Sequence, residues 1–298
     1  MRPLPKDAFH PALAIAPQSL PTRAVLGLPL VDATTPEVID TLLDGRRRSV
    51  MFLNAHCANL RATNRSYAAA LARADMVLPD GIGVELAARM RGDGFTENLN
   101  GTDFTPRLLA AAAARGLSVF LFGGTPGTAE AAARTLQARI PGLTIAGTRD
   151  GFDGAADSDA AKAEINASGA DILLVAMGAP MQELWIDRHR TALAPRVVMG
   201  VGALLDFLAG TVRRAPAAVR RARLEWVWRL AQEPRRLARR YLIGNAAFLA
   251  RAAAHTARQA DPLAVARRGV DLVASTVLIA LLLPMFAIVA AAIRRDSP

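Results

Sequence analysis

The stretch SVFLFGGTPGT, residues Ser118–Thr128, shows the strand–turn–helix pattern from which we predict the fold of this chain. Its first part, Ser118–Phe122, is a short apolar run of the kind found in buried strands, and two glycines end the run. An Ala-rich helical pattern, Thr128–Arg139, follows directly. Such a strand–glycine–helix turn can hold phosphate on its backbone N–H groups. No Lys-Ser/Thr pair follows the glycines and the spacing is not GxGxxG, so the stretch is neither a P-loop nor a dinucleotide fingerprint.

The same alternation of strand and helix signals extends from Arg23 to Gly210. It predicts an α/β fold with a doubly wound, Rossmann-like parallel sheet and helices on both faces. In such sheets, ligands bind beyond the carboxyl ends of the strands. The expected strands are Val50–Leu53, Met76–Leu78, Ser118–Phe122, Thr144–Gly147, Ile172–Ala176 and Val197–Val201. The expected helices are Asn64–Ala74, Gly83–Arg91, Asp103–Arg115, Thr128–Arg139, Ala156–Ser168 and Gln182–Ala194.

Composition narrows the classes of function. The chain has 298 residues, is 52% hydrophobic and carries a net charge of +10, which points to a polyanionic partner such as a nucleic acid, an anionic bilayer or a diphosphate substrate. A single cysteine, Cys57, excludes an internal disulfide and fits a reducing compartment. The chain has four histidines and neither a CxxC nor an HExxH motif, so we expect no metal site and no cofactor.

The positive charge gathers in a C-terminal appendage, which we define as residues 211–255. Between Thr211 and Arg251 there are eleven arginines, no lysine and two acids. Arginine binds phosphate oxygens in a bidentate way, so the appendage fits phosphate binding, with a solvated basic helix as the alternative. The expected domain order is a loose leader at residues 1–22, the sheet domain at 23–210, the appendage, and a membrane-associated segment at 266–298.

The last of these segments contains 22 consecutive uncharged residues, Leu272–Ile293, with an arginine pair on each side. This length can cross or enter a bilayer. Pro284 lies in the middle, which favours a re-entrant hairpin with both arginine pairs on one side. The alternative is a buried core helix, and we expect membrane association.

Glycine and polar clusters follow the expected strands. Asp80 stands between a strand and a Gly-x-Gly turn, where an acid has little structural purpose, so it is the leading candidate for chemistry. Asp103, near a helix N-terminus, and Gly123 and Gly124 in the turn quoted above are candidate substrate-binding residues. The clusters are Asn54–Asn59, Pro79–Gly83, Asn98–Asp103, Phe122–Thr128, Gly178–Glu183 and Gly200–Asp206.

Taken together, these clusters resemble the WecG/TagA/CpsF glycosyltransferases, which build bacterial surface polysaccharides. The resemblance covers residues 26–251. Its motifs are PDGIGV (79–84), NGTD (100–103), FLFGGTPG (120–127), PGLTIAGTRDGF (141–152), GAPMQELWI (178–186), VGALLDFLAGTVRRAP (201–216) and LEWVWRLAQEPRRLARRYLIGNAAF (224–248).

The resemblance implies an inverting, metal-independent transfer of a sugar, such as an N-acetylhexosamine, from a UDP-sugar to a polyprenyl-diphosphate-linked acceptor. It implies that Asp80 is the general base that takes the proton of the acceptor hydroxyl. By the same resemblance, Asn54, Gln182 and Asp206 bind the nucleotide and the sugar. Three appendage arginines would close over the donor and neutralise the departing UDP: Arg229, Arg236 and Arg239.

Two positions depart from the family. Phe52 stands where the family often has Thr, and Asn98 where it often has Arg, so both departures remove polar contacts near the expected donor pocket. A second, fainter resemblance links Arg267–Asp271, Pro284 and Arg294–Pro298 to the membrane hairpin that opens the polyprenyl-phosphate sugar-1-phosphate transferases. It implies a membrane anchor, which would place the chain on the cytoplasmic face of the bacterial inner membrane.

Two other functions remain as alternatives. A non-catalytic nucleotide-sugar-binding or scaffolding protein of a polysaccharide assembly complex would bind UDP without turnover. The hypothesis of a nucleic-acid binder rests on net charge alone. No recognised nucleic-acid motif is present in the sequence, so we expect no nucleic-acid partner. The sequence leaves open whether the chain forms a homo-oligomer.

Overall fold

The structure is a computed structural model. It describes residues 20–259, apart from 93, 153, 154 and 156, and a few later positions, namely 270, 271, 273–276, 278 and 282. The chain divides into two compact units, Met1–Leu249 and Ala250–Pro298. The first unit contains the sheet and every side chain discussed below.

A six-stranded parallel sheet organises the first unit, in the order β4-β3-β8-β7-β5-β6. All six strands expected from the sequence are present, which confirms the α/β class. Strands β3 and β4 are neighbours, and Leu53 pairs with Pro79 at their carboxyl ends. The strands are β3 (Arg48–Leu53), β4 (Met76–Pro79), β5 (Ser118–Gly123), β6 (Thr144–Arg149), β7 (Ile172–Ala176) and β8 (Val197–Gly200).

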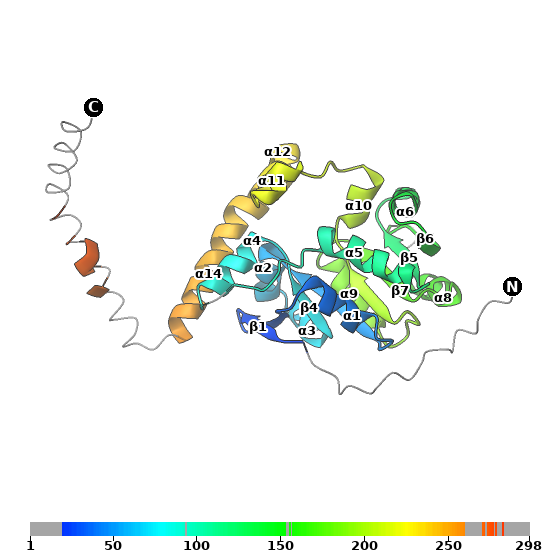
Figure 1. Ribbon diagram of the computed structural model, residues 1–298, viewed down its shortest axis with the longest axis horizontal. Coiled ribbons are helices and arrows are strands. Elements are labelled where there is room, and N and C mark those ends of the chain that lie inside the picture. The colour runs from blue at the N-terminus through cyan, green and yellow to red at the C-terminus, as the bar shows by residue number, and fades with distance from the viewer. Residues whose placement is uncertain are drawn as a thin grey trace, which may run out of the picture. The chain divides into compact units, whose positions relative to one another are not determined.

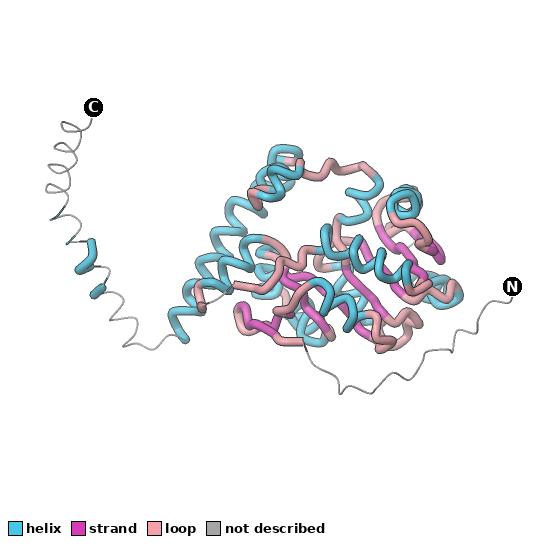
Figure 2. Tube along the Cα trace, viewed as in Figure 1, coloured by secondary structure: helices cyan, strands magenta, loops and turns pink. Residues whose placement is uncertain are grey.

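Helices cover both faces of this sheet (Figure 1; the strands are magenta in Figure 2). Side chains alternate along each strand, so Val50 and Phe52 join a buried cluster with α1 (Thr35–Leu42), α5 (Gly101–Ala114) and α6 (Thr128–Arg139). On the opposite face, the ring of Phe122 contacts that of Trp185 with centroids 5.0 Å apart. The helices of that face include α3 (Arg65–Arg73), α8 (Ser158–Ala167) and α9 (Met181–His189). The six expected helices are thus all present.

A two-stranded antiparallel hairpin, β1 (Thr22–Val25) and β2 (Leu28–Val31), precedes the sheet and was not expected. Its turn places Leu26 and Gly27 at φ 50° and 76°. A Leu-Gly turn between two four-residue strands is a weak hairpin signal, because the first turn position carries a side chain that disfavours positive φ. β1 begins at the last residue of the expected leader, and residues 1–19 lie outside the described part.

Short helices follow the sheet. α10 (Leu204–Ala209) ends where Gly210 takes φ 80°, and an extended segment then leads to α11 and α12, which lie side by side (Figure 1). A π-helical turn, η1, interrupts the helical run of the appendage. The remaining elements are α2 (Ala55–Thr63), α4 (Ile82–Arg89), α11 (Ala217–Arg221), α12 (Glu225–Gln232), α13 (Pro234–Ala238), η1 (Arg239–Ile243) and α14 (Gly244–Gln259).

Two contacts fasten the start of α14 to the sheet domain. The Asn59 Nδ2 atom donates a hydrogen bond of 2.7 Å to the Gly244 carbonyl. The fully buried Phe248 ring lies so close to Gly83 that a Cβ at Gly83 would stand 3.5 Å from it. These contacts hold the C-terminal end of η1 in register with α2 and α4.

The membrane-associated segment expected at 266–298, with its uncharged run Leu272–Ile293, lies almost entirely outside the described residues. In the part of the chain that is described, no helix combines the length and the apolar character needed to cross a membrane.

Candidate functional site

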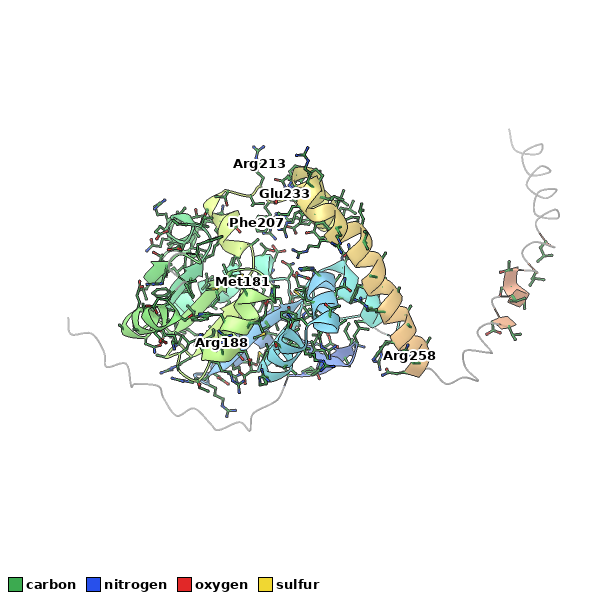
Figure 3. The ribbon with its side chains drawn as sticks, turned by 180° about the vertical axis from the view of Figure 1, so that it is seen from behind. Met181, Arg188, Phe207, Arg213, Glu233 and Arg258 are labelled. Carbon is green, nitrogen blue, oxygen red and sulfur yellow. The ribbon has the colours of Figure 1, made fainter. Side chains whose placement is uncertain are left out.

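A cavity of about 490 Å³ opens at the carboxyl ends of the parallel strands. Residues that follow β3, β4, β5, β7 and β8 line the cavity on the side of the sheet, and the appendage contributes three arginines. Figure 3 shows Met181 and Phe207 on the side of the sheet that faces Glu233, while Arg188 lies at the other end of α9. The polar lining residues are Asn54, His56, Asp80, Thr102, Thr125, Gln182, Glu183, Asp206, Arg229, Arg236 and Arg240.

Asp80 and Asn54 lie together because they follow paired neighbouring strands. The Asn54 Nδ2 atom donates to Asp80 Oδ2 at 3.2 Å. Its Oδ1 atom accepts from the Cys57 backbone N–H at 3.0 Å and so caps the N-terminus of α2. Because the cap occupies the oxygen, the amide of Asn54 can only present its NH₂ group to Asp80. The capping interaction therefore keeps the NH₂ group of Asn54 directed at the carboxylate of Asp80, the candidate general base.

Burial raises the pKa of Asp80 above its usual range, and the charge of Glu225 raises it further. The hydrogen bond from Asn54 lowers the pKa, as do the charges of Arg240 and Arg229, but burial outweighs them. A carboxylate with a raised pKa is a stronger base than an ordinary aspartate, which suits the abstraction of a proton from a hydroxyl.

Asp206 lies at another part of the cavity, on α10. Burial raises its pKa, whereas Arg236 and Arg229 lower it. The Arg229 guanidinium lies 5.3 Å from the ring centroid of Phe207, the next residue on α10. Arg236 forms an ion pair with Glu233. The arginines of α12 and α13 thus face the α10 side of the cavity.

Gln182 and Glu183 form the buried rear wall. The Gln182 Oε1 atom accepts from the Gly202 backbone N–H at 3.0 Å, and its Nε2 atom donates to Glu183 Oε1 at 2.8 Å. Burial raises the pKa of Glu183. Gln182 therefore holds the loop after β8 at a fixed distance from α9, because both ends of its amide are engaged.

In the glycine turn after β5, the candidate residues Gly123 and Gly124 lie against Ala176 of β7. Gly124 lines the cavity, but its N–H donates to the Ala176 carbonyl at 2.9 Å and is not free for a ligand. Gly123 lies outside the lining at φ 141°, and a Cβ there would stand 2.2 Å from the Ala176 oxygen. Both glycines allow β5 and β7 to approach closely.

Asp103 also lies outside the cavity lining, although the sequence made it a candidate for substrate binding. Its carboxylate accepts from Arg214 at 2.6 Å and from Arg220 at 3.5 Å. Burial would raise its pKa, but hydrogen bonds from Asn100 and Arg214 lower it overall. In this structure Asp103 ties the start of the appendage to the N-terminal turn of α5.

Among the appendage arginines, Arg240 lines the cavity whereas the expected Arg239 is exposed and lies outside the lining. Both residues belong to η1. His56 also lines the cavity, and burial and Arg240 lower its pKa to about 4, so it is neutral at physiological pH.

Of the two positions that depart from the family pattern, Phe52 lines the cavity and Asn98 contacts the turn next to Asp80. Phe52 is buried and lines the cavity, and its ring packs on Gly101, where a Cβ would stand 3.3 Å away. The Asn98 Oδ1 atom accepts from the Gly81 backbone N–H at 3.3 Å. Asn98 therefore holds the glycine turn that follows Asp80, and Phe52 gives the cavity an apolar wall.

The cavity contains a carboxylate with a raised pKa, Asp80, and arginine side chains that can bind an anion. Within the described residues, the Nε atoms of Arg229 and Arg240 are buried and have no hydrogen-bond partner. No group of three His, Cys, Asp or Glu side chains in the described part could hold a metal ion. Arg229, Arg236 and Arg240 bring guanidinium groups to the cavity, and guanidinium groups match diphosphate oxygens.

Comparison with known proteins agrees with this chemistry. Two curated relatives bear the name N-acetylglucosaminyldiphosphoundecaprenol N-acetyl-beta-D-mannosaminyltransferase. The protein of Bacillus spizizenii strain W23 is 34% identical over 173 residues, which is 58% of this chain and 66% of the relative, just under two thirds of its length. The protein of Bacillus subtilis strain 168 is 28% identical over 218 residues, 72% of this chain and 84% of the relative.

The family model described as "Glycosyl transferase WecG/TagA/CpsF family" matches residues 23–262. The match contains the whole sheet, the cavity and the arginines above it, and it confirms the resemblance seen in the sequence motifs. The chain belongs to the WecG/TagA/CpsF family of glycosyltransferases.

Proposed function

We propose that the protein transfers an N-acetylhexosamine or a related hexose from a UDP-sugar to a polyprenyl-diphosphate-linked acceptor, with inversion and without a metal ion. The observation that carries this proposal is the placement of Asp80. Its carboxylate lines the cavity, is oriented by the capped Asn54 and has a raised pKa. The names of the two relatives support the acceptor class.

The reaction is a single displacement. The acceptor hydroxyl oxygen forms a bond to the anomeric carbon while its proton passes to the Asp80 carboxylate. The bond between that carbon and the UDP oxygen breaks, and UDP leaves with the electron pair. Attack from the side opposite UDP inverts the anomeric configuration.

The leaving diphosphate needs positive charge, and Arg229 and Arg236 can supply it. Both line the cavity on the α10 side, next to Asp206. Arginines fixed before the reaction stabilise developing negative charge without reorganisation, which is the role a divalent cation has in other transferases. Asp206 and Gln182 also line the cavity and are the candidates for contacts with the nucleoside and the sugar.

The uncharged run 272–293 and its flanking arginines further support a membrane site of action, where a polyprenyl acceptor resides. We place the protein on the cytoplasmic face of the bacterial inner membrane. Chains truncated after residue 259 and after residue 210 separate the two roles. The longer chain should leave the membrane fraction but still glycosylate a soluble acceptor analogue, whereas the shorter chain should not, because it lacks Arg229 and Arg236.

A donor screen tests the transfer itself. Purified protein, detergent and a polyprenyl-diphosphate-linked sugar are incubated with single UDP-sugars, and UDP release and the product lipid are both measured. UDP release that depends on the acceptor, with a product one sugar larger, supports the proposal. Binding of UDP without transfer of any donor sugar would instead mean that the chain is a nucleotide-sugar-binding protein.

A further inference from the structure

Three arginines reach the cavity, and they are spread along it. Arg236 affects the pKa of Asp206, Arg229 affects those of both Asp206 and Asp80, and Arg240 affects those of Asp80 and His56. All three line the same cavity. Arg229 lies over the ring of Phe207, next to Asp206 on α10. The turn η1, which carries Arg240, is instead joined to α2 by the Asn59–Gly244 hydrogen bond, and α2 carries His56 and is capped by Asn54, the partner of Asp80.

Arg240 is held in a way that suits a ligand contact. Its side chain is half-buried, and its Nε atom has no hydrogen-bond partner among the described residues. The guanidinium lies 5.6 Å from the centroid of the adjacent Tyr241 ring, which in turn contacts Trp226 of α12. A guanidinium that is partly desolvated and lacks a partner at Nε can gain bonds from an incoming anion.

The chemistry assigns different substrates to the two ends. A base must reach the hydroxyl that attacks, so the acceptor sugar lies at the Asp80 end. The donor nucleotide lies on the far side of the anomeric carbon, towards Asp206. The acceptor of this class itself carries a diphosphate, on the anomeric carbon of its own sugar. A second diphosphate must therefore be accommodated beyond Asp80.

We propose that Arg240 and His56, which both line the cavity, bind the diphosphate of the polyprenyl-linked acceptor, while Arg229 and Arg236 bind the diphosphate of the donor. This inference rests on the proposed function and adds a separate anion subsite to it. Within η1, Arg240 lines the cavity, whereas Arg239 is exposed and lies outside the lining. His56 is uncharged and can donate or accept a hydrogen bond at this subsite.

Steady-state kinetics with a short-chain, water-soluble polyprenyl-diphosphate sugar tests the assignment. In Arg240→Gln, the acceptor KM should rise about 10- to 100-fold, as expected for a lost bond to a charged group. The donor KM and the affinity for UDP should stay within about twofold. Arg240→Lys should recover part of the acceptor affinity because it keeps the charge. Arg235→Gln is the matched control, because Arg235 is an exposed arginine of α13 outside the lining.

An uncharged acceptor separates a diphosphate contact from general damage. With an alkyl glycoside of the same sugar, Arg240→Gln and wild type should have equal KM values, because no diphosphate is present. A rise in the donor KM or a loss of UDP affinity would move Arg240 to the donor subsite and overturn the inference. So would an unchanged acceptor KM, or an equal penalty with the alkyl glycoside.

Binding of the acceptor analogue without donor separates the two levels of the proposal. If the wild type transfers no sugar, the proposed function fails. If the wild type binds the diphosphate analogue at least about tenfold more tightly than Arg240→Gln does, the subsite stands even then. If the two bind it equally, the subsite is wrong, whatever the turnover.

Discussion

Replacing Asp80 by asparagine should abolish transfer and at the same time stabilise the fold. The two side chains have the same size, and the carbonyl oxygen of the introduced amide could still accept from Asn54 Nδ2, which lies 3.2 Å from Asp80 Oδ2. Nothing in the packing is lost. An amide cannot take the proton of the acceptor hydroxyl, so turnover should fall about 10²- to 10⁴-fold, or roughly 3 to 5 kcal/mol of barrier.

The effect of the substitution on stability depends on whether burial of the Asp80 carboxylate or its favourable interactions with Asn54 and the arginines are larger. Changing a charged hydrogen bond to a neutral one costs about 1 kcal/mol. Burial, whose cost a neutral amide would relieve, is the largest influence on Asp80 and outweighs its partners, because the pKa is raised overall. The folded protein thus prefers the neutral carboxyl. As pH rises from the usual pKa of an unfolded aspartate, about 3.9, through the raised value in the folded protein, the ionised Asp80 takes stability away.

Asp80→Asn should therefore melt at a higher temperature than wild type near neutral pH, and the two should converge below about pH 4, where both carry a neutral side chain. Thermal unfolding at several pH values measures this, and UDP-release assays measure turnover. Wild-type kcat/KM should fall at acidic pH with the raised pKa of Asp80. A variant that keeps more than half of the wild-type turnover would remove Asp80 from the role of base. A variant that melts lower near neutral pH would contradict the burial argument.

Three further changes probe the site and its supports. EDTA should leave turnover unchanged, because guanidinium groups supply the positive charge; activity that returns only with Mg²⁺ or Mn²⁺ would refute this. Gly123→Ala should lower the free energy of unfolding in denaturant by more than about 1 kcal/mol, because its Cβ would stand 2.2 Å from the Ala176 oxygen. Gly116→Ala, at φ 69° with open space around it, should cost less, and equal losses would contradict the steric explanation. Asp103→Asn should speed tryptic cleavage in the appendage, because the carboxylate holds Arg214. Because the pKa of Asp103 is lowered in the folded state, the ionised carboxylate stabilises the fold at pH values above the usual pKa of aspartate. This stabilisation is lost as the pH falls through the lowered pKa. Below that pH, an acid-tolerant protease should cleave wild type and variant alike.

The framework of this protein can be predicted from its amino-acid sequence. Six apolar runs separated by Ala-rich helical patterns have the periods of strands and helices, and those periods depend only on local geometry. Asp80 and Asn54 could be found in the same way, because residues that follow parallel strands must gather at one edge of the sheet. The hairpin β1–β2 escaped notice because its turn carries no strong local signal.

The folded structure is needed to see which arginine lines the cavity and what several polar groups bind. Arg239 and Arg240 are chemically identical neighbours, and of the two Arg240 lines the cavity. The carboxylate of Asp103 accepts a hydrogen bond from Arg214, which lies 111 residues later in the chain, and the sequence does not reveal this contact. The Gly124 N–H, a candidate phosphate donor in the sequence, donates instead to the Ala176 carbonyl of β7. The partners of Asp103 and Gly124 are distant in sequence, and hydrogen bonds and ion pairs between such residues arise only when the chain has folded.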